Sequence, residues 1–314
     1  MNAPVIYLMG ATTTGKTRLA IDLCEKLPLD VISVDSAMVY RGMDIGTAKP
    51  GPEILLHTPH RLIDICDPSE RYSAARFRTD AIREIEDIHA GHRIPLLVGG
   101  TGLYFRTLEA GISLLPDADF EIRSCIEKEA SETGWKNIHH RLATIDPDAA
   151  EKIHPNDPQR ILRAMEVYLK TGETLTAHFQ QQSAQPLPYP IIKLILHTED
   201  RKIIHNRIKQ RFLEMLEAGL IEEVRSLYER GDLNAALPAM RMVGYRQIWR
   251  YFEHKLTYEE MVQHSIIATR QLAKRQVTWL RKEKNAVWFD CENRQLPVEI
   301  LEFFRKNNHL SVIL

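Results

Sequence analysis

The stretch Gly10-Ala11-Thr12-Thr13-Thr14-Gly15-Lys16-Thr17 has the pattern GxxxxGK[ST], and it follows the apolar run Val5-Ile6-Tyr7-Leu8-Met9. The apolar run predicts a buried strand, and the residues from Lys16 onward predict a helix. A strand, a glycine-containing turn and a helix in this order form the context of a phosphate-binding loop, or P-loop. Its backbone N–H groups and the helix N-terminus attract phosphate. The alternative, a turn of small residues that binds nothing, fits less well because both neighbouring segments have the required pattern.

Further apolar runs extend this pattern into a sheet. Residues 30–34, 94–98, 191–196 and 287–289 predict strands, and helical patterns lie between the earlier ones, including a helix that begins after an N-cap at Ser73. Near-continuous apolar strands that alternate with helices are typical of a parallel sheet covered on both faces. The sequence therefore predicts an α/β fold, with a P-loop NTPase-like parallel sheet core and helices on both faces.

Residues 116–190 have a different pattern, with helices but no strand-like runs of β-branched residues. Asp157-Pro158 predicts a helix start, because an N-cap carboxylate precedes a proline at the first helical position. Gly172 predicts the end of that helix. We therefore expect an all-helical insertion domain at 117–190, between the two parts of the core domain at 1–116 and 191–314.

The composition excludes several classes of protein. The 314 residues are 44% hydrophobic and 26% charged, as in globular proteins, and 41 Lys and Arg stand against 42 Asp and Glu. No apolar run approaches 18 residues and no secretory signal pattern opens the chain, so we expect neither a membrane span nor secretion. The four cysteines (Cys24, Cys66, Cys125 and Cys291) form no CxxC pair, which favours reduced thiols in the cytoplasm and no zinc site.

The usual companion of a P-loop is an acidic residue at a strand end that supports the Mg²⁺ site. Asp35 and Asp64 are the two candidates. Asp35 follows the 30–34 strand, which we expect next to the P-loop strand, at the sheet edge where α/β proteins bind ligands. A catalytic role is predicted for Asp35, with an N-cap or an outer Mg²⁺ contact as the alternatives. Thr101, in Gly99-Gly100-Thr101-Gly102, either hydrogen-bonds a phosphate or belongs to a structural turn.

Charge is uneven in the last third of the chain. Between Arg241 and Lys284 there are ten basic and four acidic residues, and Arg270, Lys274 and Arg281 share one predicted helical face. Arg160 and Arg163 form a second basic face in the insertion. Such stripes suit a phosphate backbone, although a solvated basic face is the simpler alternative.

From these motifs alone, two further classes of function stay open. A small-molecule kinase explains the P-loop but leaves the basic faces without a role, and the absence of NKxD disfavours a GTPase. A non-catalytic RNA-binding P-loop protein explains the basic faces but gives Asp35 no task.

Beyond single motifs, the sequence resembles the bacterial tRNA dimethylallyltransferases, also called tRNA isopentenyltransferases, over nearly its full length. Ala11 and Thr14 stand where that family usually has Pro and Ser, and both keep the loop small. The blocks that carry the resemblance are residues 10–17, 34–37, 40–50, 59–64, 97–104, 154–160, 243–247 and 269–276.

The resemblance implies transfer of a dimethylallyl group from dimethylallyl diphosphate to N6 of the adenine just 3′ of the anticodon. Lys16, with Mg²⁺ on Thr17, would neutralise the diphosphate leaving group. Asp35 would accept the N6 proton of an adenine flipped out of the anticodon loop, with Thr101 beside it. The expected partners are tRNA and the prenyl diphosphate, the expected cofactor is Mg²⁺, and the expected state is a cytoplasmic monomer. Diphosphate contacts are expected from Gly10, Ala11, Thr12, Thr13, Thr14, Gly15, Lys16, Thr17 and Arg211.

The resemblance also implies a tRNA surface drawn from four parts of the chain, with the insertion clamping the anticodon stem-loop. The expected contacts are Asp35, Ser36, Ala37, Met38, Thr101, Arg123, Gln159, Arg160, Ile161, Leu162, Arg163, Arg241, Met242, Val243, Gly244, Tyr245, Arg246, Lys274, Arg275, Gln276, Val277, Thr278, Trp279, Leu280 and Arg281.

Overall fold

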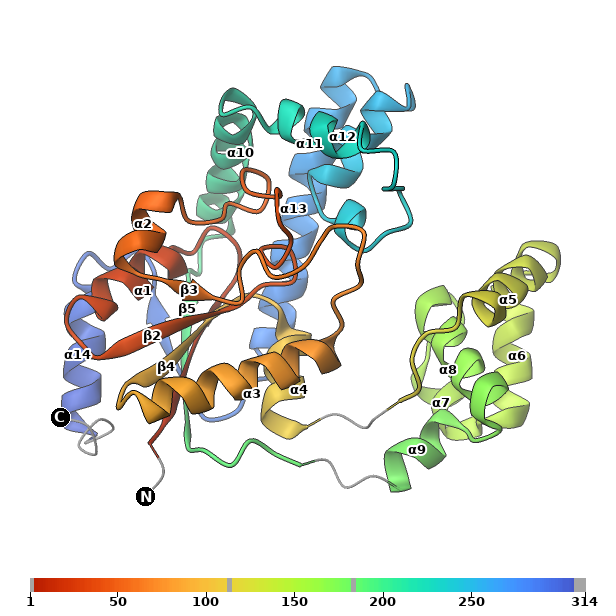
Figure 1. Ribbon diagram of the computed structural model, residues 1–314, viewed down its shortest axis with the longest axis horizontal. Coiled ribbons are helices and arrows are strands. Elements are labelled where there is room, and N and C mark those ends of the chain that lie inside the picture. Colours follow the sequence, from red (N-terminus) through yellow and green to blue (C-terminus); the bar gives the residue numbers. More distant parts are fainter. Residues whose placement is uncertain (1–2, 112–114, 182–184, 308–314) are drawn as a thin grey trace. The chain divides into compact units, whose positions relative to one another are not determined.

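A computed structural model describes residues 3–111, 115–181 and 185–307 of the chain. The chain divides into two compact units, one formed by Met1–Glu109 with Pro188–Leu314 and the other by Ala110–Leu187. Figure 1 shows both units.

The larger unit is built on a six-stranded parallel sheet with the order β3-β2-β4-β1-β5-β6. The strands predicted from apolar runs are all present, each extended by one or two residues. The two-residue strand β3 and the short helix α2 that precedes it were not predicted, because neither is long enough to show a period. The strand bounds are β1 Val5–Gly10, β2 Leu29–Val34, β3 His60–Arg61, β4 Ile94–Gly99, β5 Ile191–His197 and β6 Ala286–Asp290.

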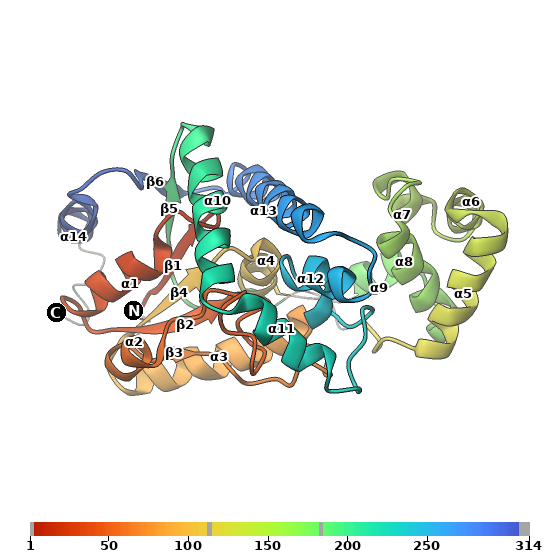
Figure 2. The same cartoon turned by 90° about the horizontal axis from the view of Figure 1, so that it is seen from above.

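Helices cover both faces of this sheet, as Figure 2 shows from above. Alternate side chains of the strands, such as Ile6 and Leu8, form one buried core with helices α1 (Lys16–Cys24) and α14 (Leu296–Lys306). The opposite face carries Tyr7, and the centroids of the Tyr7 and Phe105 rings lie 4.9 Å apart. Three helices cover this face: α3 (Ala74–Ala90), α4 (Gly102–Ala110) and α13 (Tyr258–Leu280). The predicted α/β fold class is confirmed.

The remaining helices of this unit connect strands along the chain: α2 lies between β2 and β3, and α10, α11, η1 and α12 lie between β5 and β6. The break between α10 and α11 falls at Gly219, whose φ of +98° suits glycine. Their bounds are α2 Pro52–His57, α10 Arg201–Glu217, α11 Leu220–Tyr228, the 3₁₀ helix η1 Ala239–Arg241, and α12 Tyr245–Phe252.

Three neighbouring strands end at the same level. Gly99 at the end of β4 pairs with Val34 of β2 on one side and with Met9 of β1 on the other. The expectation that the Asp35 strand lies next to the P-loop strand is therefore wrong, because β4 lies between them. Helical crossovers allow strands that follow each other in sequence to be separated in a parallel sheet. The level ends nevertheless bring the P-loop, Asp35 and the Gly99–Gly102 turn to one edge.

In its described residues, the smaller unit contains helices and the loops between them, and no strand. Its core contains Ile126, Ile138, Leu142 and Met165. Three helices begin with an aspartate that accepts a backbone N–H, and the predicted N-cap Asp157 is one of them, accepting from Arg160. The bounds are α5 Phe120–Thr133, α6 Trp135–Ile145, α7 Pro147–Lys152, α8 Pro158–Thr171 and α9 Leu175–Gln181.

One buried carboxylate joins α5 to α8. Glu166 has no exposed side-chain area, and it accepts hydrogen bonds from Arg123 at 2.7 and 2.9 Å and from Arg163 at 2.7 Å. The Asp119 N–H donates to it as well, at 2.7 Å. Burial by itself raises the pKa of Glu166, but the two guanidinium groups and the Asp119 N–H lower that pKa to about 2.

This network predicts a pH-dependent stability of the smaller unit. Since the pKa of Glu166 is about 2 in the folded unit and ordinarily about 4.3, its contribution is complete above about pH 4.3 and is lost as the pH falls toward 2. At neutral pH, Glu166→Gln should cost about 1–3 kcal/mol, because two partly buried guanidiniums lose their counter-charge. Hydrogen exchange of the α5 and α8 amides in the full chain measures this cost.

Glu129→Gln is the matched control, since Glu129 pairs with Arg141 in the same unit but its side chain is 40% exposed. An exposed pair contributes roughly 0–1 kcal/mol. A difference between wild type and Glu166→Gln that stays constant from neutral pH to pH 2 would contradict this assignment.

Candidate active site

A cavity of about 1240 Å³ opens at the edge where β1, β2 and β4 end. Its wall includes Lys16 and Thr17 of the P-loop, Asp35, Thr101 and Arg211. All of these residues belong to the larger unit. The cavity therefore unites the residues predicted for catalysis and metal binding with six of the predicted diphosphate contacts, which are Thr12, Thr13, Gly15, Lys16, Thr17 and Arg211.

The P-loop closes tightly on itself. Gly15 has a φ of +82°, and the Thr14 hydroxyl donates to the Ala11 carbonyl at 2.9 Å. A Cβ at Gly10 would lie 2.7 Å from Thr14 Oγ1 and 2.9 Å from the Leu196 carbonyl oxygen, so a larger residue does not fit there. The loop has the compact backbone that a phosphate chain requires.

Lys16 provides the positive charge of this loop. Its Nζ donates to the carbonyl oxygens of Gly10 at 2.9 Å and Ala11 at 2.7 Å. Burial lowers the pKa of Lys16 to about 8, and the negative charge of Asp35 only partly opposes this effect. Arg211 on α10 also has its pKa lowered by burial, with Asp35 again opposing. A half-buried pair of cations beside the P-loop is suited to a polyanion.

Asp35 lines the cavity and uses one of its two carboxylate oxygens within the protein. Oδ1 accepts the N–H of Ala37 at 2.8 Å and that of Met38 at 3.4 Å. Oδ2 accepts no hydrogen bond from any residue that the structure describes. Asp35 thus caps the turn that follows β2 and not a helix, and these contacts fix the carboxylate without using its second oxygen.

Thr101 is held against the Asp35 segment. Its Oγ1 accepts the N–H of Ser36 at 3.2 Å, so its hydroxyl proton stays available to a ligand. The glycines around it allow this close approach: a Cβ at Gly99 would lie 2.1 Å from the Val34 carbonyl oxygen, and one at Gly102 would lie 2.5 Å from the Trp279 ring. The Gly-Gly-Thr-Gly sequence is therefore a structural turn that also places a hydroxyl in the cavity.

The residues predicted to contact tRNA fall into three groups by location. One group lines the cavity, a second lies on α12, on α13 or at the C-cap of α13 outside the cavity lining, and a third lies in the smaller unit. The cavity group is Asp35, Ser36, Ala37, Met38, Thr101, Arg241, Met242, Val243, Gly244, Tyr245, Arg275, Gln276 and Trp279. The second group is Arg246, Lys274, Val277, Thr278, Leu280 and Arg281, and the third is Arg123, Gln159, Arg160, Ile161, Leu162 and Arg163.

Several of these side chains are turned inward. Ile161 and Leu280 are buried, and Gln276 is only 9% exposed. Arg123 and Arg163 already bind Glu166, whereas the side chain of Arg160 is 71% exposed. In the insertion, Arg160 and the exposed Gln159 are therefore the side chains best placed for a polyanion, and the tRNA contacts stay predictions.

One functional candidate was missed by the sequence analysis. The carboxylate of Glu223 on α11 accepts three successive backbone N–H groups, from Asp44 at 2.9 Å, Ile45 at 2.7 Å and Gly46 at 3.1 Å. The Tyr245 hydroxyl also donates to it, at 2.5 Å. Glu223 thus fixes the 44–46 segment beside the cavity, and no sequence spacing indicates a contact across 177 residues or more.

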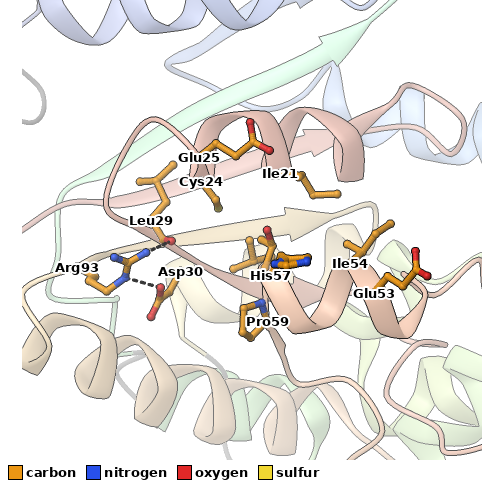
Figure 3. A pocket seen from close by; sticks show the side chains of 12 residues that line it. Ile21, Cys24, Glu25, Leu29, Asp30, Glu53, Ile54, His57, Pro59 and Arg93 are labelled. Carbon is orange, nitrogen blue, oxygen red and sulfur yellow. Dashed lines mark hydrogen bonds and ion pairs between the residues drawn. The ribbon is translucent and has the colours of Figure 1, made fainter.

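A second, smaller hollow of about 420 Å³ lies between α1 and α2 (Figure 3). Asp30 and Arg93 form an ion pair on its wall, with Nε and Oδ1 2.5 Å apart. None of the predicted site residues lines it.

The described residues contain neither a cluster of metal-binding side chains nor a helix that could span a membrane. Among the described residues, no group of three or more His, Cys, Asp and Glu could hold a metal ion. No helix within the described ranges is long and apolar enough to cross a membrane.

The fold and the cavity define a P-loop α/β protein whose phosphate loop shares a cavity with a carboxylate at the end of β2, two strands away. The sequence profile of the family described as IPP transferase matches residues 38–283, and that of isopentenyl transferase matches residues 3–67. This chain belongs to the IPP transferase family.

Known relatives agree with this placement. The chain is 59% identical over 281 residues to the tRNA dimethylallyltransferase of Thioalkalivibrio sulfidiphilus, covering 90% of this chain and 88% of the relative. Among solved structures, it is similar to the tRNA isopentenylpyrophosphate transferase of Bacillus halodurans, with 36% identity, a TM-score of 0.72, and coverage of 100% and 98% of the two chains. A eukaryotic dimethylallyltransferase solved while acting on tRNA matches with 28% identity, a TM-score of 0.82, and coverage of 98% and 80%.

Proposed function

We propose that this chain is a tRNA dimethylallyltransferase. It transfers the dimethylallyl group of dimethylallyl diphosphate to N6 of the adenine 3′-adjacent to the anticodon, giving N6-isopentenyladenosine and diphosphate. The observation that carries this proposal is the shared cavity, in which the half-buried cations Lys16 and Arg211 lie near the carboxylate of Asp35. Family membership supports the same reaction.

The P-loop side of the cavity binds the leaving group. The C1–O bond of the prenyl diphosphate breaks with its electron pair on oxygen, and Lys16 and Arg211 stabilise the charge that develops there. Thr17 places a hydroxyl in the same wall, which suits Mg²⁺ because that ion prefers a few protein oxygens with phosphate oxygens and water. When bound, Mg²⁺ would supply further charge neutralisation.

The opposite side of the cavity binds the acceptor. The adenine leaves the anticodon stack to enter the site, and its N6 forms a bond to C1 of the prenyl group. As that bond forms, N6 becomes acidic and its proton passes to Asp35, whose free Oδ2 can receive it. Thr101, fixed by Ser36, orients the acceptor beside this carboxylate.

The basic faces bind the rest of the tRNA. Arg160 and Gln159 of the insertion clamp the anticodon stem-loop, and the exposed Lys274 and Arg281 contact its backbone. Because tRNA is a cytoplasmic substrate, the enzyme works in the cytoplasm. The proposed oligomeric state is a monomer. A small-molecule kinase, the main alternative, needs no such basic faces, and the family comparison does not favour it.

Nucleoside mass spectrometry tests this reaction directly. The protein is mixed with Mg²⁺, dimethylallyl diphosphate and unmodified tRNA, without ATP, and the RNA is digested. We expect an N6-isopentenyladenosine peak. If the peak is absent although the tRNA is shown to bind, the transfer is rejected and a small-molecule kinase becomes the favoured function.

A further inference from the structure

One buried amide connects the two halves of the cavity. Gln276 lies on α13 and is only 9% exposed. Its Oε1 accepts the backbone N–H of Thr12 in the P-loop at 2.8 Å. Its Nε2 donates to the backbone carbonyl of Gly100, in the turn that carries Thr101, at 3.0 Å. Both ends of the amide are therefore used inside the protein, one on each side of the site.

The fit around this amide is tight. A Cβ added at Gly100 would lie 2.3 Å from Gln276 Nε2, so only glycine leaves room for the hydrogen bond. A glutamine amide is a donor at one end and an acceptor at the other. Glutamate, with two acceptors, and methionine, with neither group, have a similar size but cannot make both contacts. Both hydrogen bonds therefore require glutamine at position 276 and glycine at position 100.

The contacts also limit what Thr12 and Gln276 can do for the substrates. The Thr12 N–H is already donated to Gln276, so that N–H is not free for the diphosphate, and the contact expected of Thr12 stays a prediction. Likewise, the amide of Gln276 is occupied on both sides and buried, which argues against the tRNA contact expected for it.

We infer that Gln276 is a positioning residue that holds the P-loop in register with the Gly100–Thr101 turn. This inference rests on the proposed function. In the transfer, the leaving group is bound by the P-loop and the acceptor by the Asp35–Thr101 side, so the distance between the two sides sets the reacting distance. Misplacing reacting groups by about 1 Å lowers a rate roughly 100-fold without loss of binding. Gln276 acts through the backbone and touches neither substrate.

The test uses three variants of the full chain. Gln276→Met keeps the side-chain length and removes both hydrogen bonds. Gly100→Ala leaves Gln276 in place but pushes its amide away from the turn. Gln263→Met is the matched control, an exposed glutamine on the same helix outside the site. Thermal unfolding identifies any variant that fails to fold, and Gly100→Ala then tests the inference without changing Gln276.

Single-turnover transfer at saturating substrates is the main readout. For Gln276→Met and Gly100→Ala we expect a rate roughly 100-fold below wild type, with unchanged affinity for tRNA and for inorganic diphosphate. Gln263→Met should match wild type. A normal saturated rate would overturn the inference, and if tRNA affinity fell at the same time, Gln276 would be a tRNA contact instead.

Hydrogen exchange separates this inference from the proposed function. The Thr12 amide should exchange faster in Gln276→Met than in wild type, whatever reaction the protein catalyses. Unchanged exchange at Thr12 would overturn the positioning role even in an active enzyme. A wild-type protein that makes no N6-isopentenyladenosine would instead reject the proposed function.

Discussion

Asp35→Asn is expected to lower the single-turnover rate of dimethylallyl transfer by about 10²- to 10⁴-fold, the usual loss on removal of a general base. The asparagine cannot accept the N6 proton at neutral pH. It keeps an Oδ1 atom that can accept the N–H of Ala37 and of Met38, so the turn after β2 stays intact. Rates are measured at saturating tRNA and prenyl diphosphate, by mass spectrometry of the nucleosides.

The control for this variant is Glu86→Gln, which neutralises an exposed carboxylate on α3 outside the cavity. Its rate should equal that of wild type. If Asp35→Asn binds tRNA normally and transfers at the wild-type rate, Asp35 is not the base, and capping the turn after β2 is the whole of its function.

Lys16→Met is expected to lower the same rate by about 10²- to 10³-fold, because a buried charge that stabilises the leaving oxygen is lost. The affinity for inorganic diphosphate should fall as well, since a phosphate chain loses its cation. The burial that lowers the pKa of Lys16 to about 8 adds a pH signature. Below pH 8 the ammonium is present before the ligand arrives, whereas above it the proton must be taken up on binding.

Diphosphate affinity of wild type should therefore decrease as the pH rises through about 8, by up to about tenfold per pH unit. Lys16→Met should lack this additional decrease. Titration of the ligand itself is common to both proteins, so the difference between them isolates Lys16. Parallel curves for the two proteins in isothermal titration calorimetry would show that Lys16 does not titrate in this range.

Much of the local structure follows from short stretches of sequence. The Val5–Gly10 strand, the Lys16–Cys24 helix, the Asp157 cap and the stop at Gly172 are all present in the structure. Each depends on residues within a few positions, through apolar periodicity, a capping side chain or the conformational freedom of glycine. The candidates Lys16, Asp35 and Thr101 were predicted for the same reason, since each adjoins a recognisable strand end.

The sequence by itself thus determined the five longer strands, the P-loop and the α/β class of this protein. Only the tertiary structure decided that β4 lies between β1 and β2, that Glu166 occupies Arg123 and Arg163, and that Gln276 links Thr12 to Gly100. Local sequence patterns indicate which residues are buried, but they do not indicate which partner each buried polar group binds. A hydrogen bond that spans 264 residues, as between Gln276 and Thr12, forms only because the folded sheet brings both groups together.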